Sequence, residues 1–165
     1  MEDTPWLDAS EARAWRAIVL FQTQLRGFLV RGLQRDSGLS DSDFVILVNV
    51  SEAPERRIRP FELGRLTGWE KSRLSHHLRR MADRGLVAIE QCPSDNRGAV
   101  VVLTEVGLQA ITAAAPGHVR LVRSAFFDHL TDDQVQALGD IGERVGAALE
   151  VASAGEECCE EAVDP

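Results

Sequence analysis

The fold of this chain is decided by the stretch KSRLSHHLRRMADRGLV, residues 71–87. On a helical wheel its apolar residues Leu74, Leu78 and Met81 fall on one side, which predicts that this side faces a core. The opposite side carries mostly serine, histidine and arginine side chains, all of which can donate hydrogen bonds. The stretch therefore predicts an amphipathic helix over about 69–84 with a donor-rich solvent face.

The segments on either side of this helix define a larger unit. Before it, residues 60–66 begin with a proline, which suits the first turn of a short helix, and Gly68 separates the two helices. After it, residues 86–92 and 99–103 are rich in branched apolar side chains and enclose a loop of turn-forming residues, which predicts a β-hairpin. Helix, short break, helix and hairpin is the order of a winged helix-turn-helix, whose second helix enters the DNA major groove.

Long amphipathic segments flank this unit on both sides. They offer more apolar surface than a small winged head needs, so we expect them to form a homodimer. The predicted fold class is mainly α with a small β-hairpin wing, a winged helix-turn-helix flanked by N- and C-terminal dimerisation helices. The predicted boundaries are one domain over 1–152, with dimerisation helices at 8–38 and 104–150 and the winged head at 56–103, followed by an acidic, disordered tail at 153–165.

The charge of the chain is distributed unevenly. The 165 residues carry a net charge of −8, yet segment 56–97 is +5 and the remainder is −13. A basic patch on an acidic protein can bind phosphate locally while the rest resists non-specific adhesion. From charge alone, a solvated arginine-rich helical face explains the pattern equally well.

The sequence lacks the common motifs of catalysis and metal binding. We find no P-loop, G-x-S-x-G, H-E-x-x-H or C-x-x-C. We therefore predict no catalytic residues, no cofactor and no metal site. The three cysteines, Cys92, Cys158 and Cys159, lack disulfide or metal spacing, and a redox role for them stays open. With no signal peptide and no apolar run long enough for a membrane span, we expect a cytoplasmic protein with no membrane contact.

The donor-rich helix and the hairpin tip supply the candidate DNA contacts. The first half of the helix is expected to meet bases, with Arg73 able to grip guanine O6 and N7. The second half of the helix is expected to contact phosphates. Arg97, at the wing tip, is expected to enter an adjacent minor groove. Asp95 is expected to orient an arginine, and an ordinary solvated turn is the alternative for this loop. The predicted DNA-binding residues are Ser72, Arg73, Ser75, His76, Arg79, Arg80 and Arg97.

Two motifs resemble the MarR family of transcriptional regulators. One is residues 71–87, and the other is the hairpin segment D-N-R-G…V-L-T-E-V-G, residues 95–107, which is similar to the family's D-x-R…L-T-x-x-G wing signature. The resemblance implies a homodimer on a pseudo-palindromic, inverted-repeat operator of double-stranded DNA, and repression relieved by a small, often aromatic or phenolic, ligand. It places the groove-reading positions at Ser72, Ser75 and His76 and the wing arginine at Arg97. His76 and Asn96 stand where the family often has arginine.

A ligand pocket is also expected in the style of this family. Trp15, Phe44 and His118 are candidates to line it, and Arg16 to counter a ligand carboxylate. Plain core packing and a solvated arginine are the alternatives for these residues. The sequence thus predicts a dimeric DNA-binding repressor with ligand-responsive affinity; the alternative is a winged-helix protein-interaction module without DNA binding.

Overall fold

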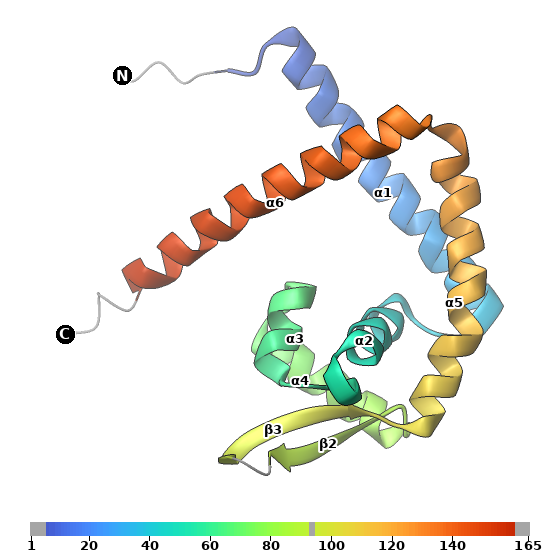
Figure 1. The fold of residues 1–165 in the computed structure, drawn as a ribbon, viewed down its shortest axis with the longest axis vertical. Helices are drawn as coiled ribbons and strands as arrows, with labels where there is room; N and C mark the ends of the chain where they lie inside the picture. The colour runs from blue at the N-terminus through green and yellow to red at the C-terminus, as the bar shows by residue number, and fades with distance from the viewer. Residues whose placement is uncertain (1–5, 93–94, 161–165) are drawn as a thin grey trace. The chain divides into compact units, whose positions relative to one another are not determined.

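The computed structural model describes residues 6–92 and 95–160, with side chains except at 92, 95–97 and 153–160. It divides the chain into two compact units, Met1–Val122 and Arg123–Pro165, and each is described by itself. The fold is mainly helical with a small antiparallel sheet, as the sequence predicts. The first unit holds the winged head and the helices that enter and leave it (Figure 1).

The first unit contains the predicted order of helix, short break, helix and hairpin, together with elements that the sequence did not predict. In chain order its elements are α1 (Ala9–Ser37), α2 (Asp41–Glu52), the 3-10 turn η1 (Pro54–Arg56), β1 (Arg57–Ile58), α3 (Pro60–Thr67), α4 (Lys71–Asp83), β2 (Val87–Cys92), β3 (Asp95–Leu103) and α5 (Glu105–Ala125), whose last turn lies in the second unit.

Side chains fix the ends of the first two helices. Asp8 accepts hydrogen bonds from the first turn of α1, and Glu11 bonds back to the Asp8 backbone. Ser40 and Asp43 form the same reciprocal box at the start of α2. Such boxes satisfy backbone N–H groups that have no partner inside the helix. Gly38 ends α1 in the left-handed conformation, at φ 71°, which a glycine adopts without a steric penalty.

The sheet contains one strand that sequence patterning misses. Strand order is β1-β3-β2, and β2 and β3 form the hairpin with Val87 opposite Leu103. The short strand β1 pairs antiparallel with β3, Arg57 opposite Val102, in a stretch that reads as a polar connector. A two-residue strand has no periodicity of its own, so only its distant partner defines it.

The core lies where α2, α3 and α4 meet the sheet. Its fully buried members are Ile46, Leu47, Val50, Leu63, Met81 and Val101. Figure 1 shows these helices gathered against the base of the hairpin. Because α4 packs into this core along its whole length, the direction of its outer face is fixed by the fold.

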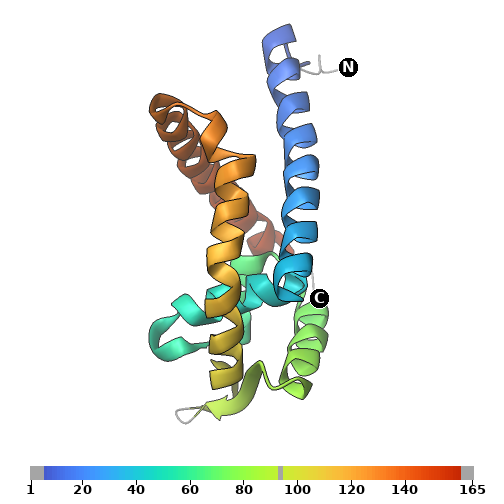
Figure 2. The same ribbon diagram turned by 90° about the vertical axis from the view of Figure 1, so that its right-hand side faces the viewer.

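Helices α1 and α5 pack together through a glycine. A Cβ placed on Gly32 would meet a methyl group of Leu121, so the Leu121 side chain packs directly against the backbone of α1 there. Figure 2 shows the lower part of α1 running beside α5. This contact ties the entering and leaving helices of the head to each other.

The second unit contains η2 (Phe127–His129) and α6 (Asp132–Glu160). Thr131 and Gln134 cap α6 reciprocally. The helix continues to Glu160, so it enters the segment predicted to be a disordered tail, and 161–165 lie outside the described residues. Within the described residues no helix is long and apolar enough to cross a membrane.

Candidate nucleic-acid interface

Helix α4 has one buried and one exposed side, as its sequence predicts. Leu74, Leu78 and Met81 are buried in the core. The opposite side exposes most of the predicted contacts, namely Ser72, Arg73, His76, Arg79 and Arg80. Ser75 lies half-buried at the edge of this face. The fold therefore brings six of the seven predicted DNA-binding residues onto one helix and leaves five of them open to solvent.

The hairpin is attached to the end of α4 through Thr104 and Gly107. The Thr104 hydroxyl lies 2.6 Å from the Gly85 carbonyl oxygen and accepts a hydrogen bond from the Gly107 N–H at 3.0 Å. A Cβ on Gly107 would lie 2.0 Å from the Leu86 carbonyl oxygen. These contacts explain the L-T-x-x-G pattern physically, because Thr104 and Gly107 hold the wing and the start of α5 against the end of α4.

The tip of the wing carries two of the predicted residues. The backbone of Asp95 and Arg97 belongs to β3, where Asp95 lies opposite Cys92. The side chains of Arg97, Asp95 and Cys92 lie outside the described part of the structure, as do those of Cys158 and Cys159. Their predicted roles therefore stay predictions.

A buried carboxylate connects α2 to the far end of α4. Asp43 is 2% exposed, and both of its oxygens accept hydrogen bonds from Arg84, with Arg84 Nη1 3.0 Å from Oδ2. The backbone N–H of Ser40 donates to the same carboxylate. His77 Nε2 lies 3.0 Å from Oδ1 but without the geometry of a hydrogen bond. Sequence patterning assigned no role to Asp43 or to Arg84.

Burial and charge shift the pKa values of this cluster. Burial disfavours the charged form of Asp43, but the hydrogen bonds from Arg84 and Ser40 outweigh it, so the pKa of Asp43 lies below its usual value. Burial lowers the pKa of His77, and Arg80 and Arg84 lower it further against the attraction of Asp43. The cluster therefore holds an ionised carboxylate beside a histidine that resists protonation.

The predicted ligand-pocket residues separate into two groups. The rings of Phe44 and His118 are in contact, with centroids 4.4 Å apart, and a small cavity of about 90 Å³ lies beside His118. Trp15 and Arg16 are exposed on the N-terminal half of α1, about 27 Å along the helix from Leu33, which lines that cavity. Within one chain, the structure does not bring the two groups together.

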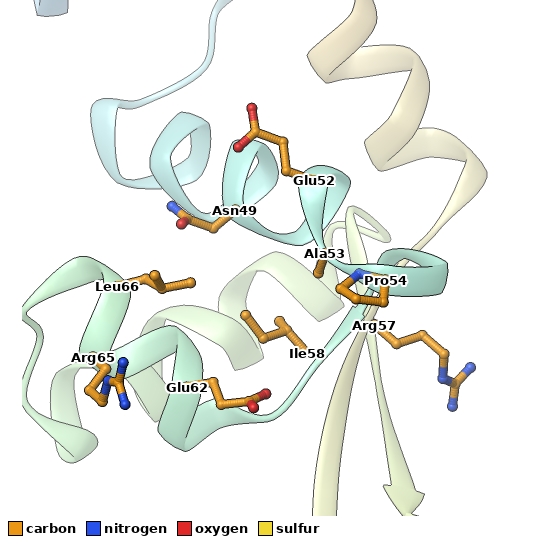
Figure 3. Close-up of a pocket in the computed structure, with 9 residues that line it drawn as sticks. All are labelled: Asn49, Glu52, Ala53, Pro54, Arg57, Ile58, Glu62, Arg65 and Leu66. Carbon is orange, nitrogen blue, oxygen red and sulfur yellow. The ribbon is translucent and has the colours of Figure 1, made fainter.

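A larger hollow of about 530 Å³ lies between α2, β1 and α3 (Figure 3). Leu66 and Ile58 reach toward its middle, whereas Glu52 and Arg57 point away from it. Arg57 forms an ion pair with Glu90, with Nη2 2.6 Å from Oε2. The polar groups that line the hollow therefore do not converge on one position, as they do in a typical ligand site. Among the described side chains there is also no cluster of three or more histidine, cysteine or acidic residues that could hold a metal.

Both the sequence and the fold of this chain are similar to those of known proteins. A model of the MarR family matches residues 37–98. The structure of Sco3205 from Streptomyces coelicolor, a MarR family transcriptional regulator in complex with DNA, is 41% identical, with a TM-score of 0.83 over 88% of this chain and 91% of that one. The chain belongs to the MarR family.

Two further relatives agree with this assignment, one of them a MarR family transcriptional regulator. AbsC, also from S. coelicolor, is 37% identical with a TM-score of 0.77, covering 89% of this chain and 99% of its own. The HTH-type transcriptional repressor YetL of Bacillus subtilis is 30% identical over 112 residues, 66% of each chain. The chain is thus a MarR-family transcriptional regulator with a DNA-binding winged helix.

Proposed function

We propose that this MarR-type regulator is a homodimeric repressor that binds an inverted-repeat operator and is released by a small ligand. The observation that carries the DNA part is the outer face of α4. Arg73, Arg79 and Arg80 are exposed there, together with His76, on a helix whose inner face is fixed in the core. Guanidinium groups suit both guanine edges and phosphates. Sco3205, the relative in complex with DNA, supports the same conclusion.

A salt titration of DNA binding tests this function directly. The purified protein is titrated with duplex from its own promoter region and with a scrambled duplex of equal length. We expect tighter binding to the promoter and a steep loss of affinity with salt, because phosphate contacts release counterions. The titration is repeated with duplexes from neighbouring promoters. If each of them binds no tighter than scrambled DNA at every salt concentration, the result favours the winged-helix protein-interaction module.

Two substitutions separate base contacts from phosphate contacts. Arg73→Ala is expected to reduce the preference for operator over scrambled DNA. Arg97→Ala is expected to weaken both complexes equally and to lower the salt slope by about 1. Arg120→Ala, which removes an exposed arginine from α5, is the matched control and should change neither. Wild-type binding by both of the first two variants would refute these contacts.

The dimer is supported by apolar surface on the outer helices. Trp15, Ile18 and Val19 on α1 are between 46% and 59% exposed. Helix α6 carries a comparable exposed stripe at Val135, Leu138, Ile141, Val145 and Leu149. Apolar patches of this kind mark interaction surfaces. A two-fold dimer would place its recognition helices about 34–36 Å apart, one turn of DNA, which explains the inverted repeat.

Sedimentation measurements test the dimer. Wild-type protein is expected at twice the 18.1 kDa chain mass. Ile18→Glu places a charge in the apolar stripe and should shift the population toward monomer, whereas Arg13→Glu on the same helix should not. A wild-type monomer at the concentrations used for DNA binding would exclude the proposed assembly.

We place the proposed effector, an aromatic acid, beside Phe44 and His118. The contact between their rings and the adjacent cavity support this location, and the Nδ1 atom of His118 is buried without a hydrogen-bond partner in the described structure. Salicylate serves as the probe. It should release operator DNA from wild type and not from His118→Leu, and release from both would place the ligand elsewhere. Trp15 and Arg16 stay predicted contributors.

A further inference from the structure

Three side chains at intervals of four residues form a stack along the start of α4. The guanidinium carbon of Arg73 lies 4.3 Å from the ring centroid of Trp69. On the same indole, His77 makes an edge contact, with centroids 5.5 Å apart and planes at 85°. Trp69 thus connects the arginine expected to read bases with the histidine beside the buried carboxylate of Asp43.

The indole is a fixed platform. Trp69 is half-buried and packs against the hydrophobic core, while Arg73 is exposed. The backbone N–H of Trp69 donates a hydrogen bond to the Gly64 carbonyl oxygen at 3.2 Å, directly after the left-handed turn at Gly68. Since the platform is anchored to α3 and the arginine belongs to α4, the stack also fixes the arginine relative to both helices of the motif.

The second anchor lies behind the indole. His77 has a side chain only 15% exposed, and it contacts both the Trp69 ring and Asp43. Asp43 is itself held by Arg84 and by the start of α2. Contacts therefore run without a break from the core of the head to the edge of Trp69, so the indole has little freedom to rotate.

The geometry leaves the arginine's hydrogen-bond donors available. A guanidinium whose carbon lies over an aromatic ring can keep the N–H groups along its edge free, whereas an ion pair with a carboxylate would use that edge. Among the residues that the structure describes, no ion pair involves Arg73. The edge is what a guanine O6 and N7 pair requires. Stacking also restricts a long side chain before binding, which reduces the entropy lost on contact with DNA.

We propose that Trp69 is a positioning residue for DNA reading, holding Arg73 in the orientation in which it recognises a guanine. The proposal rests on the proposed DNA-binding function and deepens it by assigning specificity to a residue outside the groove-facing set. In this arrangement Trp69 does not contact bases. Its effect is confined to the base pair that Arg73 reads.

The test compares variants of both residues on a defined operator. Duplexes enriched from a random library by wild-type protein give the preferred operator, and all single base-pair changes of it are then assayed. Trp69→Leu removes the aromatic face, Trp69→Phe retains one, and Arg73→Ala removes the reader. Phe61→Leu is the matched control, because Phe61 is a 76% exposed aromatic on α3.

A positioning role predicts a specific pattern. Trp69→Leu should reduce discrimination about 2- to 30-fold at the same base pair as Arg73→Ala, with little change elsewhere. Trp69→Phe should retain most of that discrimination, and Phe61→Leu all of it. The double variant Trp69→Leu/Arg73→Ala should discriminate no worse than Arg73→Ala alone, because the platform has no effect without the arginine.

The outcomes separate failure of the proposal from failure of the function. If Arg73→Ala leaves discrimination unchanged, the assignment of the reading arginine is wrong. If Arg73→Ala reduces discrimination and Trp69→Leu affects all duplexes equally, or adds fully to Arg73→Ala, the positioning role is overturned.

A measurement on the free protein remains decisive if Trp69→Leu folds poorly. The Nε–H resonance of Arg73 should show an upfield ring-current shift in wild type and in Trp69→Phe. The same resonance without that shift in folded wild-type protein would refute the stack itself.

Discussion

Asp43 offers the most informative test of how the head is held together. Its carboxylate is 2% exposed and accepts two hydrogen bonds from Arg84, and it also closes the capping box with Ser40. Asp43→Ala removes all of these contacts at once. It also leaves His77 without the neighbouring negative charge.

The expected cost follows from these contacts. Loss of the charge-assisted hydrogen bonds from Arg84 is worth about 1.5–2 kcal/mol, and loss of the capping interaction about 0.5–1 kcal/mol. Arg84 has a side chain 48% exposed, so its guanidinium regains water and the full penalty of an unpaired buried charge does not apply. We therefore expect unfolding to become easier by about 2–3 kcal/mol, or a melting temperature lower by about 4–12 °C for a chain of this size.

A matched control lies two residues away on the same helix. Asp41 pairs with Arg26 at 2.9 Å, but the two side chains are 33% and 74% exposed. Exposed ion pairs contribute at most about 1 kcal/mol, and salt screens them. Asp41→Ala should therefore cost less than half as much as Asp43→Ala, and its effect should shrink in high salt while that of Asp43→Ala persists.

Urea denaturation followed by circular dichroism measures both variants. The double variant Asp43→Ala/Arg84→Ala should be only slightly less stable than Asp43→Ala, which gives a coupling energy of about 1–2 kcal/mol. If Asp43→Ala and Asp41→Ala cost the same, or if the two sites Asp43 and Arg84 prove additive, the buried pair does not stabilise the head as argued.

Three further outcomes follow from the same structure. Gly107→Ala should destabilise the fold by about 1–3 kcal/mol in urea denaturation, since its Cβ meets a backbone oxygen, whereas Gly139→Ala, which meets nothing, should stabilise the chain slightly. Thr104→Val should cost about 1–2 kcal/mol in the same assay, and Thr104→Ser almost nothing, because the hydroxyl makes the hydrogen bonds. Burial lowers the pKa of both His77 and His118 in the folded state. The unfolded chain therefore binds more protons, so the free energy of unfolding is highest above pH ~6.5 and falls as the pH drops below it. The double variant His77→Gln/His118→Gln should flatten this dependence on pH in urea denaturation. An unchanged slope would contradict the assignment.

Helix patterning alone identified most of the recognition unit. The spacing of Leu74, Leu78 and Met81 defines the buried side of α4, and these residues are buried in the structure. The arginines opposite them are exposed, as predicted. The period of a helix is a local property, so the direction in which side chains point relative to a core can be inferred without tertiary information.

Contacts between segments far apart in the chain could not be inferred from the sequence. Strand β1 is defined by its pairing with β3, and Asp43 finds Arg84 across 41 positions of the chain. Neither pairing has a periodic signal, because the partners lie on different elements whose relative placement depends on the packed core. The expected grouping of Trp15 with His118 failed to form within one chain for the same reason.

The sequence by itself determined the order of helix, helix and hairpin, the two faces of α4, and the residues that present donors to solvent. Tertiary structure decided how those donors are held. Trp69, Arg73 and His77 recur every fourth residue, but only the fold packs the indole against the core, places the guanidinium over its ring and brings Asp43 beside the imidazole. Amphipathic periodicity is a local property of the sequence, whereas the burial and partners of a polar side chain depend on which segments the core brings together.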